Sequence, residues 1–303
     1  MKQILSLLYF FFFNMRKRHV DFTQVDSLTA YNHKFEGFFP GCNNFLYGNL
    51  QAACILEKKK IFNMQYYIEH GVVFNDSIGS VKGLPKRIKQ IYTFSQKRAT
   101  ILQTYYPYKK ITALGPYIQN VPFFKRKSEL DELKRMNGKT LVVFPVHSIP
   151  TNEAKFDEDA FLEEIEKVAK SFNKIYICLH YLDIQKSKDL LYRSKGFDII
   201  CAGHKYDIHF INRLKDIIYL SDLTMSNSLG THLGYSICLH RPHYYYHQNI
   251  EIKNGENVDN NQYEAKEAIA KEKIQHEASR LFTINHEITS LHYSFVFTYW
   301  GVF

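Results

Sequence analysis

Two patterns of hydrophobic and polar positions alternate along the second half of the chain, one typical of buried strands and one typical of helices. The run "TLVVFPVH" at 140–147 is continuously apolar, which is typical of a buried strand. The run "DEDAFLEEIEKVAKSF" at 157–172 places apolar residues on one helical face and acids in its first turn. This alternation predicts a parallel sheet with helices on both faces. Further strands are predicted at 174–181, 197–204, 222–227 and 241–247, and further helices at 183–196, 207–221 and 230–240.

The first half repeats this pattern less regularly. Strands are predicted before Glu69, at 87–95 and at 109–117, with a helix at 96–107. The charged run "FKRKSELDELKRMNGK" at 124–139 separates the two halves. The sequence therefore predicts an α/β protein with two Rossmann-like domains, 1–136 and 137–303, that face each other across a cleft. A final helix at 263–282 and the aromatic tail are expected to pack back onto the first domain.

Composition narrows the class of partner. The chain has 303 residues, of which 45% are hydrophobic and 23% charged, as in soluble globular proteins. Its formal net charge of +9 favours anionic partners such as phosphorylated substrates or acidic lipid headgroups. The basic runs lack the aromatic interleaving of RNA-binding motifs and the layout of a helix-turn-helix, so no nucleic-acid partner is expected. The 5 cysteines form no CxxC pair, which indicates reduced thiols in a cytoplasmic protein.

The apolar run at 4–13 allows two interpretations. It is about half of the roughly 20 residues that a membrane-spanning helix needs. Basic residues at 16–18 follow it, which reverses the charge order of a signal peptide. We favour a buried strand in a cytoplasmic protein. The alternative is a shallow anchor that holds the protein peripherally on the inner face of the membrane.

Polar residues gather where the predicted strands of the second half end. In open parallel sheets, ligands bind beyond the carboxyl ends of the strands, and all these ends lie on one edge. Four of the five strand ends contain a histidine. The candidate residues at this edge are His147 with Ser148, His180, Gly203 with His204, and the segment that begins at Ser226.

The segment "SNSLGT" at 226–231 joins a strand to a helix. We expect the free N–H groups of the helix start, together with the neighbouring hydroxyls, to bind the phosphate of a ligand. The alternative is that Ser228 or Thr231 only caps the helix and Gly230 only relieves strain. The candidate phosphate-binding residues are Ser226, Asn227, Ser228, Gly230 and Thr231, with Ser148, Gly203 and His204.

Three further residues are candidates for acid–base chemistry. His147, like His204, could donate to a diphosphate or protonate it as it leaves, or could be a structural histidine. Glu69 or His70, directly after an apolar strand, could deprotonate an acceptor hydroxyl. The alternative is a polar turn around Gly71. A zinc site formed by the strand-end histidines lacks supporting spacing, so neither a metal nor another cofactor is expected.

Several motifs resemble a known family. The segment "FDIICAGHKYDIHFINRLKDIIYLSDLTMSNSLGTHLGYSICLHRPHYY" at 197–245 resembles the carboxyl-terminal half of bacterial GT-B-type glycosyltransferase-like proteins from capsule and lipopolysaccharide loci. "IEHGVVF", "LGPYI" and "YWG" are similar to the same group, so the resemblance covers most of the chain. More distantly, "EHG", "VFPVHS" and "SNS" resemble motifs of bacterial GT-B sialyltransferases.

This resemblance implies roles for four residues. Glu69 matches the general base, His147 matches the histidine that contacts the donor phosphate, and Ser226 and Ser228 match the serines that grip it. The chain departs from the pattern because Ser148 replaces a proline and Asn227 separates the two serines. These departures put a cytidine donor in doubt and leave a uridine diphosphate donor open.

The resemblance and the residues together predict a metal-independent, inverting glycosyltransferase. The second domain would bind a nucleotide-sugar donor, and the first would bind a glycan or glycolipid acceptor of a surface polysaccharide or lipopolysaccharide. An anionic membrane surface is a further expected partner. Two alternatives stay open: a polyol-phosphate transferase that uses CDP-glycerol, and a non-catalytic subunit that binds a nucleotide or carbohydrate.

Overall fold

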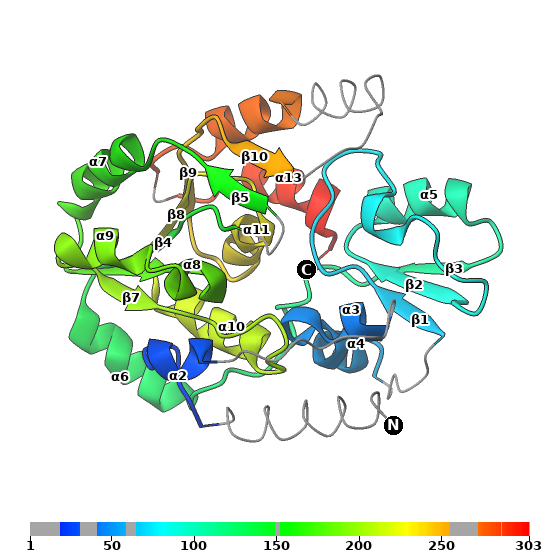
Figure 1. Cartoon of the computed structure of the whole chain (residues 1–303), viewed down its shortest axis with the longest axis horizontal. Coiled ribbons are helices and arrows are strands. Elements are labelled where there is room, and N and C mark those ends of the chain that lie inside the picture. Colours follow the sequence, from blue (N-terminus) through cyan, green and yellow to red (C-terminus); the bar gives the residue numbers. More distant parts are fainter. Residues whose placement is uncertain are drawn as a thin grey trace.

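The protein contains two parallel sheets that lie side by side (Figure 1). The computed structural model describes residues 19–30, 41–58, 65–148, 152–254, 272–285 and 287–302. The smaller sheet has the order β1-β2-β3. Helix α5 (Gln96–Tyr105) connects β2 to β3, and Ser95 Oγ caps it by accepting a hydrogen bond from the Arg98 N–H at 3.2 Å. The strands are β1 (Tyr66–Ile68), β2 (Gln90–Thr93) and β3 (Lys110–Ala113).

The larger sheet has five parallel strands in the order β7-β6-β4-β8-β9. Because β4 is its first strand along the chain, the strand order reverses between β4 and β8. Such a reversal is the point at which doubly wound α/β sheets bind ligands. The α/β class and the two facing Rossmann-like units predicted from the sequence are confirmed. The strands are β4 (Thr140–Phe144), β6 (Lys174–Cys178), β7 (Asp198–Ile200), β8 (Leu223–Ser226) and β9 (His243–Tyr245).

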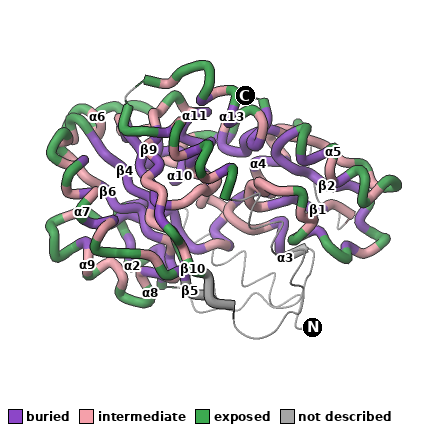
Figure 2. The backbone as a smooth tube through the Cα atoms, turned by 90° about the horizontal axis from the view of Figure 1, so that it is seen from above, coloured by how far each residue is buried: buried purple, intermediate pink, exposed green. Residues whose placement is uncertain are grey.

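The strands of both sheets are largely buried, and helices and loops carry most of the exposed positions (Figure 2). Those of the larger unit are α6 (Lys127–Asn137), α7 (Glu158–Ala169), α8 (Tyr181–Gln185), α9 (Asp189–Ser194), α10 (Phe210–Leu220) and α11 (Thr231–Cys238). The remaining described helices are α2 (Val25–Thr29), α3 (Gly41–Asn44), η1 (Leu46–Gly48), α4 (Asn49–Leu56), η2 (Gly79–Val81), a helix over 272–281 and α13 (Ser290–Trp300).

Strand β4 shows how the sequence builds the larger unit. All five of its residues are buried, and successive side chains point to opposite faces of the sheet. Leu141 and Val143 pack in one apolar cluster with Phe161 of α7. Val142 and Phe144 pack in another cluster, on the side of α10 and α11. The continuous apolar run therefore reflects a strand that is covered by helices on both sides.

Two local predictions were wrong. The helix expected at 183–196 is divided into α8 and α9, because Ser187 adopts a left-handed φ of 60° that no continuous helix allows. The polar pattern of 252–262 predicts a loop, but its first three residues belong to β10 (Glu251–Asn254). This strand pairs antiparallel with β5 (Asn152–Lys155), which the sequence pattern did not indicate.

The aromatic tail packs between the two units. Trp300, at the end of α13, is fully buried, and its Nε1–H donates to the Thr231 carbonyl at 3.1 Å. On the side of the smaller unit, its ring meets Phe74 with centroids 5.3 Å apart. A methyl group on Gly234 of α11 would lie 2.3 Å from the Trp300 ring, so only glycine permits this contact.

One face of α10 holds the segment 119–125, which connects β3 of the smaller sheet to α6 and is called the crossover below. Asn212 Nδ2 donates to the Pro122 carbonyl at 2.7 Å, and Lys215 Nζ donates to Val121 at 2.7 Å. Asp216 accepts the backbone N–H groups of residues 124 and 125, both at 2.9 Å. Helix α6, which lies before the predicted boundary at 136/137, packs against α10. The boundary stays a prediction, and this packing favours placing α6 with the larger unit.

Some sequence predictions concern residues that the structure does not describe. The apolar run at 4–13 and the first part of the helix at 263–282 lie outside the described residues. Within the described residues, none of the helices combines the length and apolar character that crossing a membrane requires. The cysteines at positions 54, 178, 201 and 238 are free thiols.

Candidate active site: a histidine-lined cavity between the two sheets

A cavity of about 950 Å³ lies where the two sheets face each other. Its volume is at the upper end of the range for small-molecule and cofactor sites. The larger sheet contributes the ends of β4 and β6 and the start of α11, so the cavity lies at the reversal point between β4 and β8. The smaller sheet contributes residues that directly follow β1. The histidines that line it are His70, His147, His180, His232 and His247.

Residues 226 and 227 support the cavity without lining it. The Asn227 side chain accepts the Val146 N–H at 2.7 Å and donates to Gln248 Oε1 at 2.9 Å. Ser226 Oγ donates to the Ser228 carbonyl at 2.9 Å and lies 3.0 Å from His243 Nε2. Both side chains are fully buried. Their hydrogen bonds fix the loops after β4, β8 and β9 relative to one another.

The next residues of the same segment do line the cavity. Helix α11 begins at Thr231, one residue after the predicted start, and both this residue and Ser228 contribute to the wall. The alternative that Ser228 or Thr231 caps the helix was wrong: Gly230 occupies the N-cap position, and no side chain caps the helix. The first N–H groups of a helix have no intrahelical partner, and the helix dipole adds partial positive charge there. This end of α11 can therefore bind an anion.

His232 lies in the first turn of α11. Its ring stacks on Phe144 with centroids 5.0 Å apart and packs against Gly230, where an added Cβ would lie 2.6 Å from its Cε1. Burial lowers the pKa of His232 to about 3, so the imidazole is neutral at pH 7. The sequence analysis missed this residue, although the histidine of "GTHLG" was part of the quoted motif.

His147 and His180 form a stacked pair at the ends of β4 and β6. Their ring centroids are 4.4 Å apart with an interplanar angle of 22°. His147 is the exposed member, and its Nδ1 lies 3.1 Å from the Ser148 carbonyl. Burial lowers the pKa of His180 well below its usual value, and the charges of His147, His204 and Lys205 lower it further. The strand-end pattern placed His180 at this edge of the sheet but did not indicate it as a phosphate-binding or catalytic residue.

His70 faces this pair from the smaller unit. Its Nδ1 lies 2.8 Å from Asn43 Oδ1, and Asn43 Nδ2 donates to the Ile68 carbonyl at 2.6 Å. Since the amide is oriented by the second bond, the neutral imidazole carries its proton on Nδ1 and its lone pair on Nε2. Burial lowers the pKa of His70, so the neutral form persists below pH 6.5. His70 can therefore accept a proton through Nε2.

The ring of Tyr47 lies between His70 on one side and the His147–His180 pair on the other. Its centroid is 6.0 Å from that of His70 and 6.5 Å from that of His180. Burial raises the pKa of Tyr47 to about 12, which keeps the phenol protonated. An aromatic wall therefore connects the end of β1 with the end of β6.

Glu69 is held inside the smaller unit. Its carboxylate is 1% exposed, pairs with Arg98 Nη2 at 2.7 Å, and accepts a hydrogen bond from Thr93 Oγ1 at 2.6 Å. Arg98 is itself buried. Glu69 is not among the residues that line the cavity, whereas the adjacent His70 is.

Three other predicted residues also lie outside the cavity wall. His204 is buried, its ring packs at an angle of 53° against Tyr181 with centroids 4.1 Å apart, and its Nδ1 accepts the Tyr206 N–H at 3.2 Å. Gly203 has a φ of +119° and lies against the buried Asp207–Arg213 ion pair. The backbone N–H of Ser148 donates to Asp183 Oδ1 at 3.4 Å.

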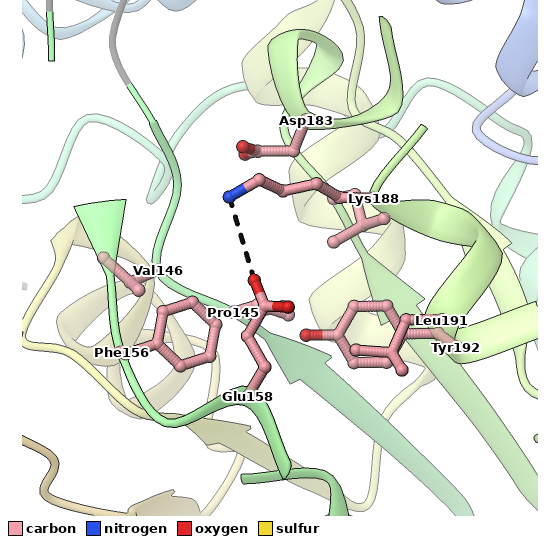
Figure 3. A pocket seen from close by; sticks show the side chains of 9 residues that line it. Pro145, Val146, Phe156, Glu158, Asp183, Lys188, Leu191 and Tyr192 are labelled. Carbon is pink, nitrogen blue, oxygen red and sulfur yellow. Dashed lines mark ion pairs between the residues drawn. The ribbon is translucent and has the colours of Figure 1, made fainter. Parts of the chain in front are cut away.

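A small recess of about 10 Å³ lies behind the β4 loop. Figure 3 shows Pro145 and Val146 beside the Glu158–Lys188 ion pair, whose atoms are 3.8 Å apart, with Asp183 close to the ammonium. Burial raises the pKa of Asp183. The recess has room for about one water molecule, so we interpret it as support for the loop that carries His147.

The charge of the cavity wall is unusual for an anion site. Among the described residues that line it there is no lysine or arginine, and the carboxylate at its rim is Glu272. Over the same described ranges, no cluster of three or more His, Cys, Asp or Glu residues is arranged to hold a metal ion. Within the described wall, positive charge therefore comes from the start of α11, and imidazoles add to it only when they are protonated.

Comparisons with known proteins give distant structural similarity. No protein-family model and no curated protein matches the sequence. The wall teichoic acid polymerase TagF is 14% identical with a TM-score of 0.38, and the alignment covers 78% of this chain and 62% of TagF. The UDP-GlcNAc 2-epimerase from Methanocaldococcus jannaschii is 11% identical with a TM-score of 0.37, over 84% of this chain and 79% of the epimerase. The chain thus spans less than two thirds of TagF, and at these values the function stays undetermined.

Proposed function

We propose that the protein is a metal-independent, inverting glycosyltransferase of the GT-B type that uses a nucleotide-sugar donor. The carrying observation is that one cavity joins an anion-binding end, at α11 and His147, to a directed proton acceptor, His70. The two ends come from different sheets. This arrangement supports transfer between two substrates held on opposite sides of the cavity.

The donor would lie against the larger sheet. Its phosphate would bind at the start of α11, beside Ser228, Thr231 and His147. As the bond between the sugar and the phosphate breaks, negative charge develops on the leaving nucleoside diphosphate. The dipole of α11 and the N–H groups of its first turn stabilise that charge, the role that a bound metal ion fulfils in other transferases.

The acceptor would lie against the smaller sheet. Its hydroxyl would give a proton to His70 Nε2 while the oxygen attacks the anomeric carbon from the face opposite the leaving group, which inverts the configuration. We propose His70 as this base. Glu69, whose carboxylate is paired with Arg98, would instead fix the end of β1 that carries His70. The acceptor would be a glycan or glycolipid of a surface polysaccharide.

The decisive test measures transfer and donor hydrolysis in the presence of EDTA. The panel contains UDP-, GDP- and CMP-linked sugars, with CDP-glycerol as the probe for the polyol-phosphate alternative. Turnover of a nucleotide sugar without metal supports the proposal, whereas an absolute requirement for manganese contradicts it. Turnover of CDP-glycerol alone would identify a polyol-phosphate transferase.

Thermal unfolding with CMP, CDP, UDP and GDP identifies the nucleotide, because a ligand that binds only the native state raises the melting temperature. A His147→Ala variant then tests the non-catalytic alternative. An enzyme loses turnover on this substitution while its melting temperature in buffer is kept. A binding subunit has no turnover before or after the change.

A further inference from the structure

Two histidines in the cavity wall have ring nitrogens that are shielded from solvent and have no hydrogen-bond partner among the described residues. For His180 these are both Nδ1 and Nε2, and for His232 it is Nε2. The side chains as a whole are only partly buried, so a rotation of each ring is what would bring its shielded nitrogens to a molecule in the cavity. Buried polar atoms of this kind are rare in native proteins, and they indicate a missing partner.

Both histidines line the cavity. His180 lies two residues after the end of β6, and His232 belongs to the first turn of α11. His147 stacks on His180 and interacts electrostatically with His232. The helix start that carries His232 has no side-chain cap.

The chemistry of imidazole indicates the class of the missing partner. A neutral ring has one donor and one acceptor, whereas a protonated ring has two donors and a positive charge. Lysine and arginine do not occur among the described lining residues, so histidines are the described side chains of the wall that can become cationic partners of a bound anion. A phosphate group has enough acceptor oxygens to satisfy rings on both sides of it.

We propose that His180 and His232 are the anion-binding pair for the donor phosphate, and that they take up protons as the anion binds. The inference rests on the donor site proposed above and adds two residues to it. It also makes the site respond to pH: protons enter with the donor and leave with the product.

The neighbours of both rings keep them neutral while the cavity holds no anion. His180 faces the imidazoles of His147 and His204, the Lys205 ammonium, and the phenols of Tyr47 and Tyr181. Burial lowers its pKa most, and electrostatic interactions with His147, His204 and Lys205 lower it further. A bound dianion opposes each of these effects, so it raises the pKa of His180.

His232 has a different set of neighbours. It faces His147 and His243, the ring of Phe144, and the Ser228 carbonyl, which favours the protonated ring. Burial dominates and keeps the ring neutral. An anion at the start of α11 again raises the pKa. For each proton taken up, the dissociation constant of the anion increases about tenfold per pH unit as the pH rises.

Sulfate is the suitable probe because it stays doubly charged between pH 5.5 and 8.5, so any pH dependence comes from the protein. Calorimetric titration of wild-type protein with sulfate, in two buffers of different ionisation enthalpy, measures the protons taken up. Ring C–H resonances in NMR spectra report the pKa of each histidine. We expect proton uptake, a sulfate dissociation constant that rises about tenfold per pH unit or more, and upward pKa shifts confined to the cavity histidines.

Variants assign the effect to the two rings. His180→Phe and His232→Phe keep an aromatic ring but remove its nitrogens, and each should weaken sulfate binding at least tenfold at pH 6. The control is His240→Asn, at an exposed histidine whose φ of 55° asparagine tolerates; it should leave binding unchanged. The wild-type titration needs no variant, so misfolding of a variant cannot hide a negative result.

A sulfate affinity that is constant from pH 5.5 to 8.5, with unmoved resonances of His180 and His232, would overturn the inference. This failure is separable from failure of the proposed function. If a nucleotide sugar is turned over without metal while sulfate binding ignores pH, the transferase stands and the histidine pair does not. If sulfate binds with proton uptake but no nucleotide competes for the site, the pair stands and the transferase does not.

Discussion

Polar residues at the strand ends belong to two layers that differ in how their hydrogen bonds are used. The support layer is Glu69, His204, Ser226 and Asn227, whose exposed fractions range from 0% to 4%. Its side chains are bonded to other protein groups. The cavity layer is His70, His147, His180 and His232. Each of these rings has at least one nitrogen atom for which the described residues show no hydrogen-bond partner. Residues of the same types around one cavity thus serve different purposes, and the number of their internal hydrogen-bond partners distinguishes them.

The boundary between the layers falls between adjacent residues in two places. After β1, Glu69 is paired inward with Arg98 while His70 lines the cavity. After β8, Asn227 joins three loops while Ser228 lines the cavity. Each adjacent pair places a residue that fixes the backbone directly before one that faces the cavity. Variants at these positions test whether the distinction holds.

The largest expected effect is on turnover at His70. His70→Gln removes the proton acceptor, and we expect kcat to fall about 100- to 10,000-fold, the usual contribution of a general base. The free energy of unfolding should change by less than about 1 kcal/mol, since a polar side chain can still meet Asn43. Kinetics and urea unfolding measure the two quantities. Full turnover in this variant would show that His70 is not the catalytic base.

Glu69→Ala should show the opposite profile. The substitution leaves the buried Arg98 guanidinium without its carboxylate, which we expect to lower the free energy of unfolding by about 3–5 kcal/mol. The matched control is Glu129→Ala, which removes an exposed ion pair with Arg126 and should cost less than about 1 kcal/mol. Urea unfolding compares the two. A stable but inactive Glu69→Ala protein would indicate that Glu69, and not only His70, acts in catalysis.

A smaller effect is expected at the start of α11. In Gly230→Ala the new Cβ would lie 2.6 Å from His232 Cε1, so the ring has to move away from Phe144. We expect about tenfold weaker binding of whichever nucleotide raises the melting temperature most. Gly79→Ala is the control, because its Cβ would meet Ser77 Oγ at an ordinary 3.6 Å. Equal affinities of the two variants would show that the position of His232 does not matter for binding.

The smallest effect is a displacement of the pH profile. Because burial lowers the pKa of His70, the neutral base persists as the pH falls through 6.5. The acidic limb of kcat/KM should therefore lie below pH 6.5, with the rate falling about tenfold per pH unit beyond it. A limb centred above pH 6.5 would mean that another group, or a solvated His70, accepts the proton.

The sequence predicted the architecture better than the site. Periodicity located every strand of the larger sheet, because strands buried on both faces leave continuous apolar runs. It did not indicate β5 or β10, whose pairing depends on segments almost 100 residues apart. For the site, the sequence located the strand ends but not the direction of their side chains. Glu69 and His70 could be distinguished only once Arg98, 29 residues further on, was seen beside the carboxylate.

The hydrogen bonds between α10 and the crossover also limit how substrates reach the cavity. Hinge closure needs a few connecting residues that are free to change their backbone angles. Here residues 119–125 are bonded to Asn212, Lys215 and Asp216 of a single helix, so swinging one sheet away from the other would break five hydrogen bonds together. Exchange of substrate and product is therefore expected to proceed through movement of loops at the cavity rim, with the distance between the sheets kept constant during turnover.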